Sequence, residues 1–281
     1  MNSITARFGA LVFASLAAGV PFIAHSAPPA ELPGIAEAPW RFSADIYGWL
    51  PSAPAAITVN DQTVADLPES LNTVISSLSF AAMARFDARK GPLGFYASPI
   101  FYDGTYDDNF VGKVSGAPRD YEISETVWLI DYGVSYEIGR WDIGAEPDSG
   151  IITLEPYAGF RFFHDKFRMN VDPIAFPGPV GDGVRVRKTI SSNAPVIGLH
   201  SEWWLSRNLA LHLKGDYGGF GVDKMDKTYQ AISWFAYHFE WGKLHSKVLA
   251  GYRFLHLDLK DDPVEVKVDV RGPLIGLGFE F

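Results

Sequence analysis

The strongest constraint on this chain is an alternation of side-chain character with a period of two residues. It is clearest over residues 128–138, where large apolar side chains occupy every second position and small or polar ones occupy most of the others. The first set is Trp128, Ile130, Tyr132, Val134, Tyr136 and Ile138, and the second is Leu129, Asp131, Gly133, Ser135 and Glu137. Because successive residues of a strand point to opposite faces, this segment is expected to be a strand with one apolar and one polar face.

Nine further segments repeat the pattern between turn signals, so about ten strands are expected. These segments are residues 40–50, 80–89, 93–102, 152–163, 196–205, 209–217, 231–241, 244–254 and 272–281. Each has the length of about 10 residues that a tilted strand needs to cross a bilayer. Pro99 and Pro156 each remove one donor from a ladder, which leaves eight or twelve strands as alternatives.

The two faces of these segments differ in charge as well as in size. Large apolar groups suit contact with lipid, whereas the charged face suits a lumen, and this combination is typical of a transmembrane barrel. A soluble two-sheet sandwich would have to bury either the charged faces of the strands or the large apolar ones. Tight connections such as 90–92 alternate with the long segments 51–78, 103–127, 164–195 and 218–230 and with a projecting hairpin at 255–272. The sequence therefore predicts an all-β, antiparallel up-and-down barrel with both termini on the side of the short turns.

The start of the chain has the features of a secretory signal peptide. Arg7 precedes an apolar stretch at 8–23, and small residues flank the end of this segment near Ser26. We expect residues 1–26 to be removed, residues 27–39 to form a periplasmic segment and residues 40–281 to form the barrel. No later stretch reaches the about 20 apolar residues of a transmembrane helix.

Composition narrows the classes of partner and cofactor. The chain has no cysteine, which rules out disulfides and thiolate metal sites, and its net charge of −9 argues against a nucleic-acid partner. No histidine-rich ligand spacing is present. We expect neither a cofactor nor a metal.

The first long segment carries the only helical signal. Five apolar residues after and around Pro68 fall on one helical face, namely Leu67, Leu71, Val74, Ile75 and Leu78. Counting back from the C-terminus places Val264, Val266, Val268 and Val270 on the inner face of the last hairpin, with Leu255, Leu257 and Leu259 opposite them. We predict that a short helix packs on this face and covers the outer mouth of the barrel.

The polar faces collect charges of both signs that are expected to line the lumen. They are Arg41, Asp45, Arg85, Asp87, Asp131, Glu155, Arg161, Glu202, Lys214, Asp216, Glu240, Lys247 and Arg253, together with Arg89, Glu137 and Glu280. Buried charges generally persist only when paired, and a barrel of about ten strands has a narrow interior. An ion-paired plug is therefore the main interpretation, and a narrow, selective path for a solute is the alternative.

A hydrolase is a third interpretation, because histidines and carboxylates share the polar faces. His200 and Ser201 are adjacent and must face opposite sides of one strand, so they do not form a catalytic dyad. His212 with Asp216, and His238 with Glu240, do share a face. Proximity of this kind is expected by chance among so many polar groups.

The last residues resemble a known assembly signal. Gly276, Phe279 and the terminal Phe281 are similar to the ending of outer-membrane barrel proteins, a glycine followed at fixed spacing by two aromatic residues. The resemblance implies that the outer-membrane barrel assembly machinery recognises this strand.

A wider resemblance covers most of the chain. Residues 215–223, 251–255 and 272–281, with 47–51 and 80–94, look like a widespread group of largely uncharacterised outer-membrane β-barrel proteins of Gram-negative bacteria. This resemblance implies the fold, the outer-membrane location and contact with its lipids, but no activity.

The expected function is thus that of a non-enzymatic integral barrel with a charge-paired lumen, acting in narrow passage of a small solute or in envelope structure. A surface binding or adhesion barrel that acts through segments 103–127 and 164–195 is one alternative. A hydrolase with a histidine and carboxylate site is the other.

Overall fold

The structure is a computed structural model in which a defined set of residues is described. These are residues 35, 38–50, 55–59, 62–67, 78–111, 118–143, 150–171, 174–176, 178–180, 184–261 and 264–281. The expected signal peptide lies outside them, as do Leu71, Val74 and Ile75 of the expected loop helix. Among the described residues, no helix is long and apolar enough to cross a membrane.

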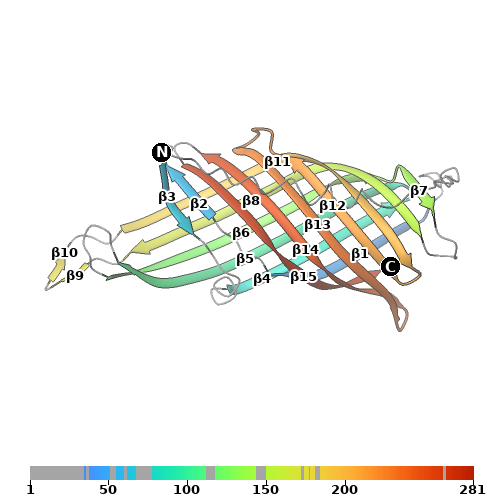
Figure 1. The fold of residues 1–281 in the computed structure, drawn as a ribbon, viewed down its shortest axis with the longest axis horizontal. Coiled ribbons are helices and arrows are strands. Elements are labelled where there is room, and N and C mark those ends of the chain that lie inside the picture. The colour runs from blue at the N-terminus through green and yellow to red at the C-terminus, as the bar shows by residue number, and fades with distance from the viewer. Residues whose placement is uncertain are drawn as a thin grey trace, which may run out of the picture.

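Ten long strands form the wall of the molecule (Figure 1). They are β1 (Trp40–Trp49), β4 (Leu78–Lys90), β5 (Leu93–Val111), β6 (Pro118–Tyr136), β8 (Ile151–Val171), β11 (Val184–Ser206), β12 (Leu209–Gly218), β13 (Met225–Trp241), β14 (Leu244–Asp261) and β15 (Val264–Glu280). The shorter strands are β2 (Ala55–Val59), β3 (Gln62–Leu67), β7 (Gly139–Asp142), β9 (Ile174–Phe176) and β10 (Gly178–Val180).

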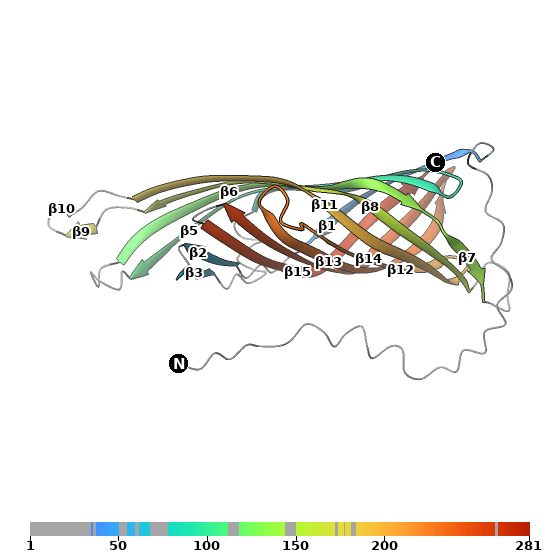
Figure 2. The ribbon, with the colours of Figure 1, turned by 90° about the horizontal axis from the view of Figure 1, so that it is seen from above.

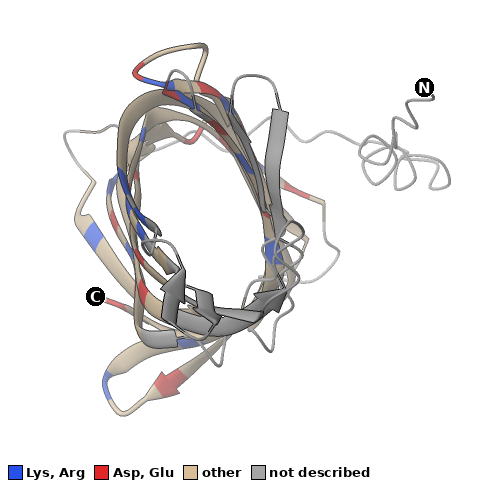
Figure 3. Ribbon diagram, turned by 90° about the vertical axis from the view of Figure 1, so that its left-hand side faces the viewer, with Lys and Arg blue, Asp and Glu red and all other residues tan. Residues whose placement is uncertain are grey.

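The wall closes on itself because β1 pairs with β15 as well as with β4. Every neighbouring pair of the ten wall strands is antiparallel, and Figure 3 shows the resulting ring seen along its length. At the closing seam the backbone of Phe42 donates to Phe281 O at 2.8 Å, and Phe281 N donates to Phe42 O at 2.9 Å. Closure gives each of the ten wall strands a ladder partner on both sides, which is the general solution for sheets that span membranes. The predicted fold class and the strand number of about ten are confirmed.

The outer surface of the wall is apolar. Large side chains that are at least one-third exposed point outward from it, among them Phe86, Trp128, Phe160, Ile197, Phe235 and Ile275. Rings also gather near both ends of the wall, with Trp40, Phe42 and Phe281 at one end and Phe80, Phe101 and Trp128 at the other. An apolar band between aromatic girdles is the architecture of an outer-membrane barrel.

The two ends of the barrel differ. Tight turns at 91–92, 207–208 and 242–243 lie at the end that also holds Trp40 and Phe281. Gly91 and Gly242 have φ of 56° and 67° in these turns, a left-handed conformation that glycine adopts without steric cost. Because short turns face the periplasm in such barrels, we call this end periplasmic and the other end outer.

Two of the expected long loops are instead continuations of the wall. Strands β5 and β6 stay paired as far as Val111 and Pro118, and β8 and β11 as far as Val171 and Val184. Both hairpins extend beyond the rest of the wall in Figure 2. Beyond the bilayer both faces of a strand meet water, so the apolar alternation stops although the backbone pairing continues.

The first long segment also forms strands where it is described. Strand β2 pairs with β15 through Val264–Val59 to Val268–Ala55, and β3 pairs with β2. Leu67 ends β3 and Leu78 begins β4, so the assignment of these two residues to a helix is wrong. Leu67 joins the ladder opposite Ala55, and Leu78 joins it opposite Gly104. That a short helix covers the outer mouth of the barrel stays a prediction.

The inner face of the last hairpin is apolar, as the register counted from Phe281 predicts. Leu255, Leu257 and Leu259 of β14 are each at most 3% exposed, and Val266 and Val270 of β15 pack against the same cluster. Met225, Leu129 and Phe163 join it from β13, β6 and β8. This apolar cluster occupies the outer part of the lumen, and Asp131, Arg161 and Asp216 lie on the periplasmic side of it.

Candidate functional site: the charged lumen

The middle of the lumen contains a group of charges centred on Arg161. Arg161 is fully buried on the inner face of β8. Its Nε donates to Asp131 Oδ1 of β6 at 2.7 Å, its Nη2 donates to Asp216 Oδ1 of β12 at 3.1 Å, and its Nη1 donates to Thr228 Oγ1 of β13 at 2.6 Å. One guanidinium thus joins four strands, and we call Arg161, Asp131, Asp216, Thr228 and Gln230 the central cluster.

The remaining hydrogen-bonding positions of the two carboxylates are also occupied. The side-chain amide of Gln230 on β13 donates to Asp131 Oδ2 at 3.0 Å and also to Asp216 Oδ2. The hydroxyl of Tyr157 donates to Asp216 Oδ2 at 2.8 Å. Buried charges persist when paired and hydrogen-bonded, and both conditions hold here.

Two further cations border the central cluster. Lys214 Nζ lies 4.7 Å from the ring centre of Tyr96 and 4.5 Å from that of Tyr157. Arg253 places its Nη2 3.5 Å from Asp131 Oδ2 and its Cζ 4.8 Å from the ring centre of Trp49. Cations over aromatic faces gain electrostatic stabilisation away from water. Arg253 therefore connects the charged part of the lumen with the apolar cluster above it.

A second group of polar side chains lies nearer the periplasmic end. Arg89 of β4 bonds to Glu137 Oε2 at 3.1 Å and to Glu155 Oε2 at 2.5 Å. Glu155 Oε2 lies 3.4 Å from His200 Nδ1, and His200 Nε2 lies 3.2 Å from His212 Nδ1. The ring of His212 stacks on Trp234 with centres 4.7 Å apart.

Further ion pairs lie on the inner face of the wall, apart from the central cluster. Lys247 of β14 bonds to Asp45 of β1 at 3.1 Å and to Glu280 of β15 at 3.4 Å, across the closing seam. Arg85 pairs with Asp87 on the same strand at 2.6 Å. The contacts of Lys247 connect β14 with β1 and β15, and the middle of the lumen is left to the central cluster.

Three of the expected lumen residues make none of these contacts. Arg41 is exposed near the periplasmic end. Glu240 pairs with His245 at 2.6 Å, and both side chains are more than half exposed at the turn between β13 and β14. Glu202 is half-buried, with no hydrogen bond or ion pair to any residue that the structure describes.

Thr228 and Gln230 are central residues that the sequence pattern did not identify. The expected strand starts at Ala231, but β13 begins at Met225, and both residues lie on its inner face. Both could be found from the sequence by continuing the two-residue alternation backward from Ile232.

The histidine pairs expected for a hydrolase are not formed as expected. His212 contacts His200 and Trp234, while His238 lies nearest Glu280, at 3.9 Å, and against Trp204. Ser201 donates to Thr153 O at 3.0 Å and accepts from Trp203 Nε1 at 2.8 Å. In the described part of the chain, no three histidine or carboxylate side chains are placed to hold a metal ion.

Little space is left between the charges. A cavity of about 50 Å³ is bordered by side chains of the central cluster and its neighbours, including Asp131, Lys214, Arg253 and Tyr47. Since about 10 to 15 Å³ of such space is enough for one water molecule, this cavity has room for a few waters.

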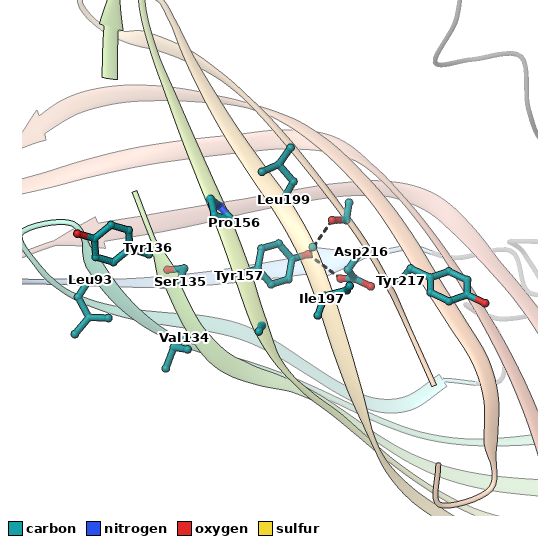
Figure 4. Close-up of a pocket in the computed structure, with 13 residues that line it drawn as sticks. Leu93, Val134, Ser135, Tyr136, Pro156, Tyr157, Ile197, Leu199, Asp216 and Tyr217 are labelled. Carbon is teal, nitrogen blue, oxygen red and sulfur yellow. Dashed lines mark hydrogen bonds between the residues drawn. The ribbon is translucent and has the colours of Figure 1, made fainter. Parts of the chain in front are cut away.

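A larger hollow lies on the lipid-facing side of the wall (Figure 4). It has a volume of about 820 Å³ and is bordered by outward-facing apolar side chains, among them Val134, Tyr136, Leu199 and Tyr217. Tyr157 lies at its floor, where its hydroxyl bonds to Asp216 and, at 3.3 Å, to Gly215 O. A Cβ at Gly198 would lie 2.4 Å from the Tyr157 ring, so glycine is needed there for the ring to cross the wall strands. The hollow is therefore a depression of the outer wall.

The sequence matches no protein-family model and no curated protein. Solved structures with a similar fold include the outer membrane protease OmpT from Escherichia coli, at 11% identity and a TM-score of 0.49, with 88% of this chain and 100% of that chain covered. The translocator domain of the autotransporter NalP from Neisseria meningitidis has 11% identity and a TM-score of 0.39 over 85% of this chain and 86% of that chain. The outer membrane protein OprG from Pseudomonas aeruginosa has 9% identity and a TM-score of 0.28 over 86% and 95%. Likeness at these levels carries no information about activity.

Proposed function

We propose that this protein is a non-enzymatic integral barrel of the outer membrane whose lumen is closed in its resting state and whose role is structural in the envelope. One observation carries the proposal. Arg161 is fully buried at the middle of the lumen and bonds to side chains from β6, β12 and β13. A water-filled channel would leave such a guanidinium hydrated, as in the wide barrels that conduct solutes.

The polar plug and the apolar cluster act in series along the barrel. Below, Arg161 is paired with both Asp131 and Asp216; above, Leu255, Leu257 and Leu259 present a dry surface. An ion that entered would have to displace paired charges and then cross apolar side chains without its water shell. Both barriers favour a closed barrel with a structural role over a barrel that conducts a small solute.

Single-channel recording in planar bilayers tests the proposal. The wild type is expected to show no conductance. A variant with Arg161→Ser, Asp131→Ser and Gln230→Ser, combined with Leu255→Ser and Leu257→Ser, is expected to conduct because it removes both barriers. Asp226→Ser with Lys260→Ser, an exposed ion pair of 3.0 Å, is the matched control and is expected to stay silent. Discrete wild-type openings whose ion selectivity changes on Arg161→Glu would overturn the proposal and establish the selective path.

A second candidate function is binding at the cell surface. It is favoured by the continuation of β5–β6 and β8–β11 as paired strands beyond the wall, since a rigid hairpin presents side chains in a fixed arrangement (Figure 2). Removal of residues 106–122 would leave the transmembrane part of both strands intact. If whole cells that carry this deletion lose binding to host cells or matrix, while the barrel still folds, the binding function is supported.

A further inference from the structure

The outward face of the β8–β11 hairpin carries four cations close together. Lys166 and Arg168 lie on β8, and Arg185 and Arg187 lie on β11, all of them exposed. Arg168 pairs directly with Arg187 in the ladder, Lys166 with Thr189 and Arg185 with Asn170. We call these four residues the basic patch.

The arrangement of the patch is unfavourable for the isolated protein. Residues directly opposite in an antiparallel pair have Cβ atoms about 5 Å apart, and like charges at that separation repel. None of the four cations makes an ion pair with a carboxylate of the described residues. The outward carboxylate of Glu122 on β6 accepts a hydrogen bond from Asn170 at 3.3 Å.

The cation on the opposite face of the same hairpin is different. Lys188 points inward and bonds to Asp261 of β14 at 2.6 Å, and Lys224 bonds to the same carboxylate at 3.2 Å. Hydrogen bonds from these two lysines lower the pKa of Asp261. Inward cations thus have partners within the protein, and the basic patch has none among the described residues.

The patch lies directly beyond the outer aromatic girdle. Trp128 pairs with His164 in the ladder between β6 and β8, and its ring contacts Phe101 at 4.5 Å. Lys166 and Arg168 follow His164 on the same face by two and four residues. At about 3.3 Å per residue and a tilt of about 40°, they stand roughly 5 to 10 Å farther from the bilayer centre. The headgroup layer occupies about this depth on each side of the hydrocarbon.

From these observations we propose that the basic patch binds the phosphate groups of anionic lipids in the outer leaflet. Two guanidiniums side by side match the bidentate hydrogen bonding of a phosphate, and a bound phosphate removes their mutual repulsion. The aromatic girdle below holds the acyl chains of the same lipid. The bound lipid fixes the depth of the barrel and the direction of the projecting hairpin.

The test measures lipid binding by the full barrel folded in micelles of a neutral detergent. Fluorescent phosphatidic acid is titrated against the wild type, with phosphatidylcholine of the same chains as the neutral probe. The variant is Arg168→Gln with Arg187→Gln, and the matched control is Lys224→Gln with Lys260→Gln, two cations of the same end that have carboxylate partners. Heat-modifiable migration on gels verifies that every variant is folded.

We expect saturable binding of phosphatidic acid that weakens about thirtyfold in the Arg168/Arg187 variant, equivalent to about 2 kcal/mol, since each basic residue near an anionic lipid surface contributes about 1 kcal/mol. The control variant is expected to bind within about twofold of the wild type. Equal binding of phosphatidylcholine, or unchanged binding in the Arg168/Arg187 variant, would overturn the proposal. If inorganic phosphate displaced the lipid at a concentration similar to that of the phosphatidic acid, the patch would be assigned to free phosphate, and the lipid assignment would be overturned.

Discussion

Replacement of Arg161 by methionine is the sharpest test of how the lumen is held together. Arg161→Met keeps most of the side-chain volume but removes the donors that reach Asp131, Asp216 and Thr228. Asp131 and Asp216 then stay buried without the positive charge of Arg161 and with fewer hydrogen-bond donors. Asp131 keeps Gln230 and Arg253 as neighbours, and Asp216 keeps Tyr157 and Gln230.

The expected cost follows from that partial compensation. Removal of one partner from a buried ion pair costs about 3 to 5 kcal/mol, and the remaining donors place the expected value near the lower limit, about 3 kcal/mol. That is a large part of the about 5 to 15 kcal/mol by which proteins are stable. Adding Asp216→Asn removes a carboxylate that Arg161 no longer pairs with, while Asp131 keeps its contact with Arg253, so the double variant is expected to regain part of the loss.

Urea unfolding in lipid vesicles, followed by tryptophan fluorescence, measures these free energies. A loss below about 1 kcal/mol in Arg161→Met would refute the argument that Arg161 compensates the two carboxylates. If the double variant were as unstable as the single one, the loss would come from packing around residue 161 and not from uncompensated charge.

Two further predictions concern a close contact in the wall and an ion pair outside the bilayer. Gly94→Ala would place a Cβ 2.4 Å from Ser135 Oγ, so it is expected to cost about 1 to 3 kcal/mol in the same unfolding assay. Addition of Ser135→Ala is expected to relieve the cost, because the Ser135 Cβ lies 3.7 Å away, and no relief would contradict the steric cause. Asp269→Asn is expected to cost less than about 1 kcal/mol at pH 7, since the hydrogen bond from His256 at 2.7 Å lowers the pKa of the half-exposed Asp269 below its usual 3.8. This stability is present above the unfolded pKa and is lost as the pH falls through the folded one, so wild type and variant are expected to converge in acid titrations; a constant difference would contradict the assignment.

The sequence indicates the wall of this barrel better than its ends. Within the bilayer one face of each strand must be apolar, and segments such as 128–138 and 244–254 therefore show their register directly. Outside the bilayer that requirement ends, so the sequence pattern predicts loops where β5, β6, β8 and β11 continue as strands.

The composition of the lumen follows from period two, but its pairing does not. Alternation places Arg161, Asp131 and Asp216 on inner faces without telling which strands face each other across the barrel. Those contacts depend on strand tilt and stagger, which the ladder registers set. Thr228 and Gln230 were missed for a related reason, since a single neutral polar residue carries little signal until its charged neighbours are located.

The seam between β1 and β15 has a kinetic consequence. All other neighbours in the wall are joined by hairpins or lie close in sequence, whereas Phe42 and Phe281 come from opposite ends of the barrel chain. Loop-closure entropy makes such contacts slow to form, so the hairpins are expected to assemble first and the seam last. Until Phe281 has arrived, β1 and β15 both present open edges, and an incomplete chain remains exposed to aggregation during its passage to the membrane.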